Sequence, residues 1–446
     1  MMTISNSSRS PLDRFLGLFA EVRAGESPTA VLLTLNVLLL LTAYSILKPV
    51  RDALILVEKG AEVKSYASAG QAILLLGAVP LYAALAGRLP RRPLINRVTL
   101  FFAACLVLFY ILARLHVPLG VIFFLWMGIF NLMVIAQFWS FANDLYTPEA
   151  GKRLFAIVAF GASSGAVIGS FVTRRLSGPL GVYQLLLVAA GILALSLLIT
   201  NVVDSRERGR AAERAAARAA EADEPIGKEG AFRLVLGNRY LLWIALLILF
   251  LNWVNTNGGY ILDRTVERAA DEAMASGTLN GLSGEEYKKQ YFGKFYADFY
   301  LVVNWVGLVV QLFLVSRIFK YLGVRVAILF LPVIALGGYA LLAFYPVLGA
   351  VRWAKTAENA TDYSLYNTVR QVLFLPTTRQ QKYKAKQAID TFFVRAGDVL
   401  SAALIFAGTT WFSFGTRQFA LVNLGFVLVW IVLAVLIGRE NRRLTA

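Results

Sequence analysis

Residues 29 to 57 decide the fold class, and they read TAVLLTLNVLLLLTAYSILKPVRDALILV. No charged side chain occurs in this stretch before Lys48. A helix that crosses a lipid bilayer needs about 20 mostly apolar residues. Ser27 and Pro28, immediately before the stretch, are typical of an N-cap and a first helical turn. The stretch is therefore predicted to be a transmembrane helix.

Apolar runs of similar length recur along the chain and predict about twelve transmembrane helices in two sets of six. The first set comprises 29–57, 67–87, 94–114, 118–143, 151–174 and 181–203, and the second comprises 239–261, 292–318, 324–345, 347–374, 386–412 and 417–438. The predicted fold class is an all-α integral membrane protein. Its predicted parts are an N-terminal interfacial helix at 1–28, an N-terminal six-helix half at 29–203, a basic cytoplasmic linker at 204–238, a C-terminal six-helix half at 239–438 with an extracytoplasmic insertion at 263–291, and a cytoplasmic tail at 439–446.

The composition supports a membrane protein and excludes several function classes. Of 446 residues, 58% are apolar and 16% are charged, whereas soluble domains are about 45–50% apolar and about 25% charged. The sequence has one cysteine, Cys105, and one histidine, His116, so a zinc or iron–sulfur site would lack its cluster of ligands. The sequence also lacks a phosphate-binding loop and a dinucleotide fingerprint. We therefore expect no cofactor, no metal and a protein that is not an enzyme.

The positive charges are distributed unevenly, and their distribution predicts the orientation of the chain. The net charge is +17, and every second connection between predicted helices is rich in Lys and Arg, as cytoplasmic loops are. Both termini are therefore predicted to be cytoplasmic, in the inner membrane of a bacterium. Basic residues also recur every four positions in the linker, at Arg206, Arg210, Arg214 and Arg218. We expect this stripe to contact anionic lipid headgroups, and not nucleic acid, because no aromatic residue interleaves it.

The two predicted halves resemble each other. The fourth helix ends in Gln137 to Asn143, followed by a Lys-Arg pair, and the tenth ends in Tyr366 to Pro376, followed by a lysine-rich turn. Parallel six-helix repeats related about the membrane normal are the architecture of major-facilitator transporters, which bind their substrate between the halves near the middle of the membrane. The fold is therefore predicted to be major-facilitator-like.

Charged residues inside the first predicted span are candidates for function, because insertion scales put the cost of each at about 2.5–3.5 kcal/mol. Lys48, Arg51 and Asp52 surround Pro49, which is expected to kink the helix. The alternative is that these charges lie at the outer interface of the membrane.

The tenth predicted span carries a polar stripe. Its residues recur at intervals of three or four, at Arg352, Lys355, Asn359, Asp362 and Tyr366, and Arg370 lies near the continuation. Such a stripe is expected to face water or substrate and not lipid. Glu358 is near enough in sequence to pair with Lys355 or Asp362, so the alternative is that part of the stripe consists of charges that compensate each other.

Two further spans carry polar residues. In the eleventh, Asp390, Arg395 and Asp398 are candidates for coupling or gating, with a structural latch as the alternative. In the seventh, Asn255 and Asn257 precede a double glycine, residues 258–259, which is expected to break the helix as the proline does in the first span. Asp263 follows as a further candidate for gating. Interrupted helices at matching places in two halves point to a binding site.

Two local patterns predict packing and capping. Gly161, Gly165 and Gly169 recur every four residues in the fifth span, and small residues at that period let two helices approach closely. Ser283 and Glu286 form a capping box. The eighth helix is therefore expected to begin outside the bilayer.

Several segments resemble the ATP/ADP translocase family, the nucleotide transporters of plastids and intracellular bacteria. The segments are LKPVRDAL at 47–54, FWSFAN at 138–143, EAGKR at 149–153, YSLY at 363–366, Leu375-Pro376, and KYKAKQAID at 382–390. The resemblance implies a major-facilitator fold and transport of nucleotides by exchange or proton-linked uptake. It also implies that Lys48 and Arg51 bind phosphate, with Arg370 where the family tends to have lysine.

The chain departs from that family in its acidic residues. It has Asn367-Thr368 and Gln371 where the family usually has aspartate-proline and glutamate, and it lacks the family's glutamate in the fourth helix. These departures weigh against adenine-nucleotide exchange and remain compatible with an anionic substrate.

We therefore expect a secondary active transporter that moves a nucleotide, with ATP or ADP among the options, or a related organic anion by alternating access. The alternatives are a proton-coupled carrier of another anionic metabolite, using Asp52, Asp362 or Asp390, and a non-transporting membrane scaffold or sensor. The candidate substrate-binding residues are Lys48, Arg51, Asp52, Phe138, Trp139, Asn143, Asn255, Asn257, Arg352, Lys355, Asp362, Tyr366 and Arg370, and the candidate coupling or gating residues are Asp263, Asp390, Arg395 and Asp398. The sequence leaves the oligomeric state open, with a monomer as one option.

Overall fold

The computed structural model describes residues 11–12, 22–23, 26–146, 148–207, 230–277, 282–378 and 381–445. Most of the predicted N-terminal interfacial helix lies outside these residues. So does most of the predicted basic linker, including Arg210, Arg214 and Arg218.

The described residues form helices and contain no β-strand, which confirms the predicted all-α fold class. The elements of the N-terminal part are α2 (Ser27–Arg88), α3 (Arg91–Arg114), α4 (Gly120–Phe130), η2 (Asn131–Ile135), α5 (Ala136–Leu145), α6 (Pro148–Leu176) and α7 (Gln184–Glu207). Those of the C-terminal part are α9 (Ala231–Gly237), α10 (Arg239–Ala275), α11 (Gly284–Val309), η4 (Val310–Leu314), α12 (Val315–Tyr321), α13 (Gly323–Phe344), α14 (Leu348–Thr361), η5 (Asp362–Tyr366), α15 (Asn367–Val372), η6 (Gln381–Ala385), α16 (Lys386–Ala388), η7 (Ile389–Phe393), α17 (Val394–Thr410) and α18 (Thr416–Thr445).

Within the described residues, nine helical stretches are long and apolar enough to cross a membrane. Two of them, Ser27–Tyr82 and Gly284–Phe344, each contain two of the spans predicted from the sequence. The predicted span 347–374 corresponds to α14, η5 and α15. It is not one of the nine stretches, because its polar stripe makes it less apolar than they are. The helices therefore account for all twelve predicted spans.

The first helical interruption lies at Gly60 and not at Pro49. Pro49 is inside α2, whereas Gly60 has φ 81° and ψ 175°, which separates the two predicted spans that α2 joins. Glycine has no Cβ and adopts such positive φ values without strain. The expected break at Gly258–Gly259 is wrong, because α10 continues as an α-helix to Ala275.

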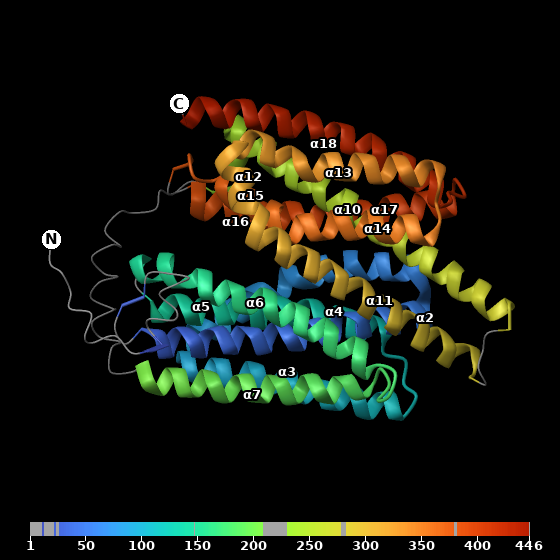
Figure 1. Ribbon diagram of the computed structural model, residues 1–446, viewed down its shortest axis with the longest axis horizontal. Helices are drawn as coiled ribbons and strands as arrows, with labels where there is room; N and C mark the ends of the chain where they lie inside the picture. The colour runs from blue at the N-terminus through green and yellow to red at the C-terminus, as the bar shows by residue number, and fades with distance from the viewer. Residues whose placement is uncertain are drawn as a thin grey trace. The chain divides into compact units, whose positions relative to one another are not determined.

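The chain divides into two compact units. Unit 1 comprises 1–51, 77–119 and 126–225, and unit 2 comprises 52–76, 120–125 and 226–446. In unit 1, α3 lies alongside α7 (Figure 1). The predicted glycine stripe packs on α2, because a Cβ at Gly165 would lie 2.3 Å from the Leu38 carbonyl oxygen. The sequence prediction of a close helix approach at this stripe is therefore confirmed.

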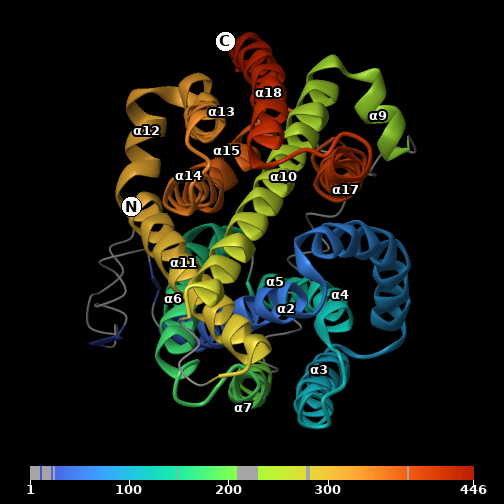
Figure 2. The ribbon, with the colours of Figure 1, turned by 90° about the vertical axis from the view of Figure 1, so that its right-hand side faces the viewer.

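Unit 2 is built around α10, which contacts α14, α17 and α18, while α13 packs along α18 (Figure 2). The core includes fully buried aromatic side chains such as Tyr260, Tyr339 and Trp430. At the start of α11, the Glu286 backbone amide donates to the Ser283 hydroxyl at 3.3 Å, which confirms the predicted N-cap. Residues 52–76 of α2, on both sides of the Gly60 interruption, belong to this unit and bring their charges to α10 and α11.

Candidate functional site

A buried group of three charges in unit 2 joins α2 to α10. The Lys64 ammonium lies 3.2 Å from Asp52 Oδ1 and 2.8 Å from Asp263 Oδ1. Asp52 has no exposed surface, and Asp263 is 4% exposed. One buried ammonium therefore contacts two buried carboxylates, one in α2 and one in α10.

We call Asp52, Lys64 and Asp263 the Asp–Lys–Asp triad. Two tyrosines of α11 donate hydrogen bonds to its carboxylates. The Tyr300 hydroxyl donates to Asp52 Oδ2 at 2.7 Å, and the Tyr296 hydroxyl donates to Asp263 Oδ1. The two tyrosines are four residues apart, so they lie on one face of α11. Each carboxylate of the triad therefore accepts a hydrogen bond from a tyrosine of α11 and contacts the Lys64 ammonium.

Local backbone geometry positions Lys64. The left-handed conformation of Gly60 ends the first segment of α2, and the next residue, Ala61, donates its amide to Glu267 Oε1 at 2.7 Å. Arg264 contacts Glu62 at 3.0 Å on the same side. These contacts hold the second segment of α2 against α10, so that Lys64 reaches both aspartates.

A second buried polar group of unit 2 lies between α10, α13 and α14. Lys355 is 2% exposed, and its ammonium lies 2.9 Å from Glu358 Oε1 and 2.8 Å from Asn255 Oδ1. The Tyr339 hydroxyl donates to Glu358 Oε2 at 2.9 Å. The sequence-predicted pairing of Lys355 with Glu358 is confirmed, so this lysine is already neutralised by the protein.

Gly258 makes room for that group. A Cβ at this position would lie 2.0 Å from the Tyr339 hydroxyl oxygen and 2.9 Å from the Lys355 nitrogen. The glycine that was expected to break the helix instead allows two polar side chains to approach the α10 backbone.

Two further groups fasten α10 to its neighbours. Asp398 accepts hydrogen bonds from Asn252 at 2.8 Å and Thr256 at 2.9 Å, and it pairs with Arg395 at 3.0 Å. These contacts are internal and Asp398 is 8% exposed; the structural latch and the coupling role both stay predictions.

Asn257 belongs to the second of these groups. It donates to Asn423 Oδ1 at 3.0 Å and accepts from the Ser401 hydroxyl. Asn257 therefore connects α10 with α17 and α18 inside the core of unit 2.

The other residues of the polar stripe differ in how far their side chains are buried. Arg352 is half-buried, with its guanidinium carbon 5.7 Å from the centre of the Phe295 ring, and Arg370 and Asp362 are also half-buried. Tyr366 has no exposed surface, and its hydroxyl accepts from the Trp430 indole at 3.3 Å. The stripe therefore offers partly accessible charges at Arg352, Asp362 and Arg370 and a packed core residue at Tyr366.

Asp390 lies apart from these groups. It is an exposed residue, and it pairs with Lys386 one helical turn earlier at 2.6 Å.

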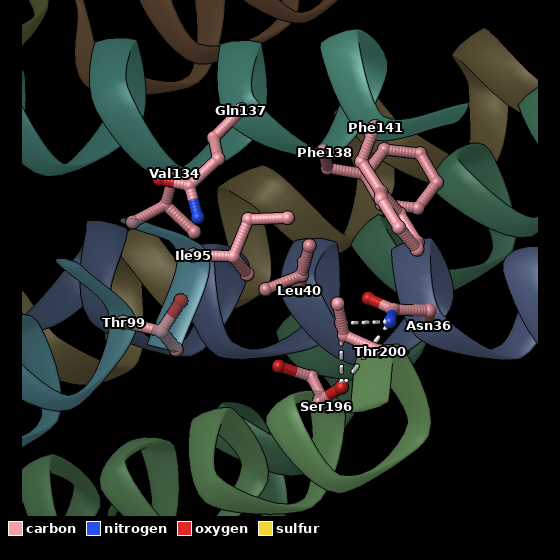
Figure 3. Close-up of a pocket in the computed structure, with 10 residues that line it drawn as sticks. All are labelled: Asn36, Leu40, Ile95, Thr99, Val134, Gln137, Phe138, Phe141, Ser196 and Thr200. Carbon is pink, nitrogen blue, oxygen red and sulfur yellow. Dashed lines mark hydrogen bonds between the residues drawn. The ribbon is translucent and has the colours of Figure 1, made fainter. Parts of the chain in front are cut away.

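The remaining candidate residues lie in unit 1. Lys48 and Arg51 are half-buried on α2, Trp139 is half-buried and packs on Phe138, and Asn143 is exposed. Figure 3 shows Phe138 at a small cavity of about 20 Å³, which is room for one water molecule. Its polar side chains are Asn36, Thr99, Gln137, Ser196 and Thr200. The cavity is too small for an organic substrate.

Sequence reasoning missed Lys64, Tyr296 and Tyr300. Lys64 lies in the connection between two predicted spans, where a lysine is ordinarily a solvated loop residue. The four-residue spacing of the two tyrosines was the one available signal, and it does not identify their acidic partners. Within the described residues, no group of three or more His, Cys, Asp and Glu side chains is arranged to hold a metal ion.

Comparison with known proteins now adds to this geometry. The family model for the Major Facilitator Superfamily matches residues 33–358, which is more than half of the chain. The chain belongs to the Major Facilitator Superfamily. A comparison with curated protein sequences returned no match.

Solved structures of other members share the fold. A bacterial homolog of the human lysosomal transporter Spinster is 15% identical, with 94% of this chain and 98% of that chain covered and a TM-score of 0.57. The nucleoside transporter NupG is 12% identical, with 92% and 98% covered and a TM-score of 0.61. The human organic anion transporter MFSD10 is 14% identical, with 92% and 100% covered and a TM-score of 0.56. The superfamily and these neighbours indicate a membrane transporter and not an enzyme.

Proposed function

We propose that this protein is a secondary active transporter of small organic anions, with nucleotides as the leading substrate class, and that it works by alternating access. The observation that carries the proposal is the pair of half-buried arginines, Arg352 and Arg370, on the polar pass formed by α14, η5 and α15. In a transporter of this superfamily, cations inside a span are costly unless they serve a polar path.

Four cations within the spans suit a phosphate or carboxylate. Arg352, Arg370, Lys48 and Arg51 are all half-buried. Lys355 is buried and pairs with Glu358. Arginine binds phosphate and carboxylate groups through two parallel hydrogen bonds. Among the predicted substrate-binding cations we therefore favour the four half-buried ones over Lys355.

The nucleotide part of the proposal rests on the resemblance of the first, fourth, tenth and eleventh predicted spans to ATP/ADP translocases. The nucleoside transporter NupG and the organic anion transporter MFSD10 share the fold. Their substrates are compatible with the proposal, although the likeness itself concerns the fold alone.

A thermal-shift series tests the substrate class, because a ligand that binds the folded state raises its stability. We expect ATP, ADP or GTP to raise the unfolding temperature of the purified protein and adenosine to leave it unchanged. The doubly substituted Arg352→Gln/Arg370→Gln protein should lose the shift. Arg268→Gln, at an exposed position of α10, is the matched control and should retain it. A shift that survives in the double variant would contradict the proposed anion site.

A proton-coupled carrier of another anionic metabolite is the second candidate, and the Asp–Lys–Asp triad favours it. In this candidate function Asp52 and Asp263, which both contact the Lys64 ammonium, are the proposed proton-binding groups. Uptake into proteoliposomes driven by a pH gradient should then fall in Asp52→Asn and in Asp263→Asn, while exchange without a gradient persists. Uptake that ignores both the gradient and the two substitutions would exclude this candidate.

A further inference from the structure

One end of unit 2 carries a basic pocket that none of the transport residues occupies. The C-terminal end of α18 and the start of α13 lie together at this end (Figure 1). The pocket has a volume of about 540 Å³. It is lined by Arg239, Trp243, Arg325, Leu436, Arg439, Glu440, Arg442 and Arg443.

Contacts between α10, α13 and α18 fix the positions of the helices that carry the pocket residues. α18 approaches α13 closely, because a Cβ at Gly438 would lie 3.5 Å from the Cα of Arg325. Asn441 donates to the Tyr240 hydroxyl at 2.8 Å, and that hydroxyl donates to the Leu373 carbonyl at 2.8 Å. The arginines therefore project from helices whose spacing is held by buried contacts.

The charge of the pocket selects an anion. Five arginines and one glutamate line it, which gives a net charge of +4. Glu440 pairs with Arg443 at 3.5 Å and compensates one of the arginines. Arginine is the side chain best suited to phosphate recognition because of its planar fork of donors.

The pocket lies at the ends of candidate membrane spans, which favours a lipid over a soluble anion as its ligand. α10 begins at Arg239, at one end of a candidate membrane span, and the candidate span in α18 ends at Leu444. The Arg239 guanidinium lies 4.5 Å from the centre of the Trp243 ring, and tryptophan is enriched at the membrane–water interface. Basic pockets between helices on the cytoplasmic side are known to bind acidic lipid headgroups.

An apolar track leads from the pocket along α18. Leu436 lines the pocket, and Val432 and Leu428 precede it at four-residue intervals, so the three lie on one helix face. Val432 is 58% exposed and Leu428 is 54% exposed. A free phosphate makes no apolar contact with these side chains, whereas an acyl chain would cover them.

We propose that this pocket binds the phosphate headgroup of an anionic phospholipid, with one acyl chain along Leu436, Val432 and Leu428. The site is independent of the substrate and coupling residues. The distribution of Lys and Arg among the connections predicts that this pocket lies on the cytoplasmic side. There its charges would anchor α10, α13 and α18 to the membrane surface.

Native mass spectrometry of the full-length protein tests the proposal with phosphatidylglycerol, phosphatidylcholine and inorganic phosphate as separate probes. We expect the wild type to retain phosphatidylglycerol in preference to phosphatidylcholine. Arg325→Gln/Arg439→Gln should weaken that retention roughly tenfold. The control Arg317→Gln/Lys320→Gln removes the same charge from exposed positions outside the pocket lining and should leave it unchanged.

A further variant protects the test against misfolding. The Arg443 side chain is 80% exposed, so Arg443→Gln costs no packing and should still weaken phosphatidylglycerol retention by about fivefold. Equal retention by the pocket variants and the control would overturn the proposal. Displacement of the lipid by inorganic phosphate would also overturn it, because the pocket would then be a site for soluble anions.

Discussion

Gly258 and Gly259 are adjacent in α10 and have different surroundings. A Cβ at Gly258 would meet the Tyr339 hydroxyl at 2.0 Å, whereas a Cβ at Gly259 would meet nothing within 4 Å. We expect Gly258→Ala to lower the free energy of unfolding by about 1–3 kcal/mol because it overpacks the core. Gly259→Ala should raise it by about 0.5–1 kcal/mol, as alanine favours a helix. Thermal unfolding in detergent measures both, and equal effects would contradict the assigned role of Gly258.

Lys64 compensates two buried carboxylates, so its loss should be costly. Removing one partner of a buried ion pair typically costs about 3–5 kcal/mol, and we expect Lys64→Gln to lower the unfolding temperature accordingly. Lys59→Gln, at an exposed position five residues earlier, is the control and should change little. Adding Asp263→Asn to Lys64→Gln should restore part of the lost stability, because it removes one of the two carboxylates that Lys64 contacts. No restoration would argue against the triad.

Glu26, just before α2, should make the stability of unit 1 sensitive to acid. Burial alone would raise the pKa of Glu26, but its hydrogen bonds to Arg153 and to the Arg23 amide, with the arginine charges, hold that pKa below its ordinary value of 4.5. Ionised Glu26 therefore contributes stability that is complete above about pH 4.5 and is lost as the pH falls through its lowered pKa.

Glu26→Gln is the substitution that tests this pH dependence. The variant should unfold at a lower temperature than the wild type at neutral pH, and the difference should shrink as the pH falls below 4.5. Glu285→Gln, whose side chain is 70% exposed, is the control and should track the wild type at every pH. A difference that stays constant with pH would contradict the assignment.

At the scale of single contacts, the sequence was informative for neighbours along a helix. The pairs Lys355–Glu358 and Arg395–Asp398 are three residues apart, and this spacing identified both as possible pairs. Lys64 and Asp263 are 199 positions apart, and no local pattern connects them. Long-range charge pairs depend on how helices pack, which a single sequence does not contain.

At the scale of elements, the glycine stripe of α6 makes the clearest packing prediction. A Cβ at Gly165 would lie 2.3 Å from the carbonyl oxygen of Leu38 on α2, so Gly165→Ala must push the two helices apart. We expect this substitution to cost about 1–3 kcal/mol and to reduce the yield of folded protein. Gly191→Ala in α7 meets nothing within 4 Å and is the control. Equal thermal stability of the two variants would contradict the close packing of α2 and α6.

Helix positions were predictable because apolar run length is a strong signal in membranes, and all twelve predicted spans coincide with helices. Helix interruptions were less predictable. The sequence placed them at Pro49 and at residues 258–259, while the structure places the interruption of α2 at Gly60. Proline remains compatible with a long helix when neighbouring helices stabilise it, and a glycine pair permits a break without requiring one.

At the scale of the whole molecule, net charge proved a poor guide to the substrate. Much of the +17 lies in connections and tails, and part of it lines the basic pocket at the end of unit 2. The charges that we propose to bind the substrate are few and half-buried, namely Lys48, Arg51, Arg352 and Arg370. Composition therefore established a membrane protein, and the position of individual charges supports an organic anion as substrate.

The most direct test of the account is counterflow in proteoliposomes that hold the full-length protein and are preloaded with unlabelled nucleotide. Labelled ADP or labelled adenosine is then supplied outside. The account predicts that ADP accumulates and adenosine does not, and that Arg352→Gln/Arg370→Gln abolishes the accumulation while Arg268→Gln preserves it. Accumulation of adenosine to the level of ADP, or accumulation of ADP that persists in the double variant, would contradict an anion transporter that uses these two arginines.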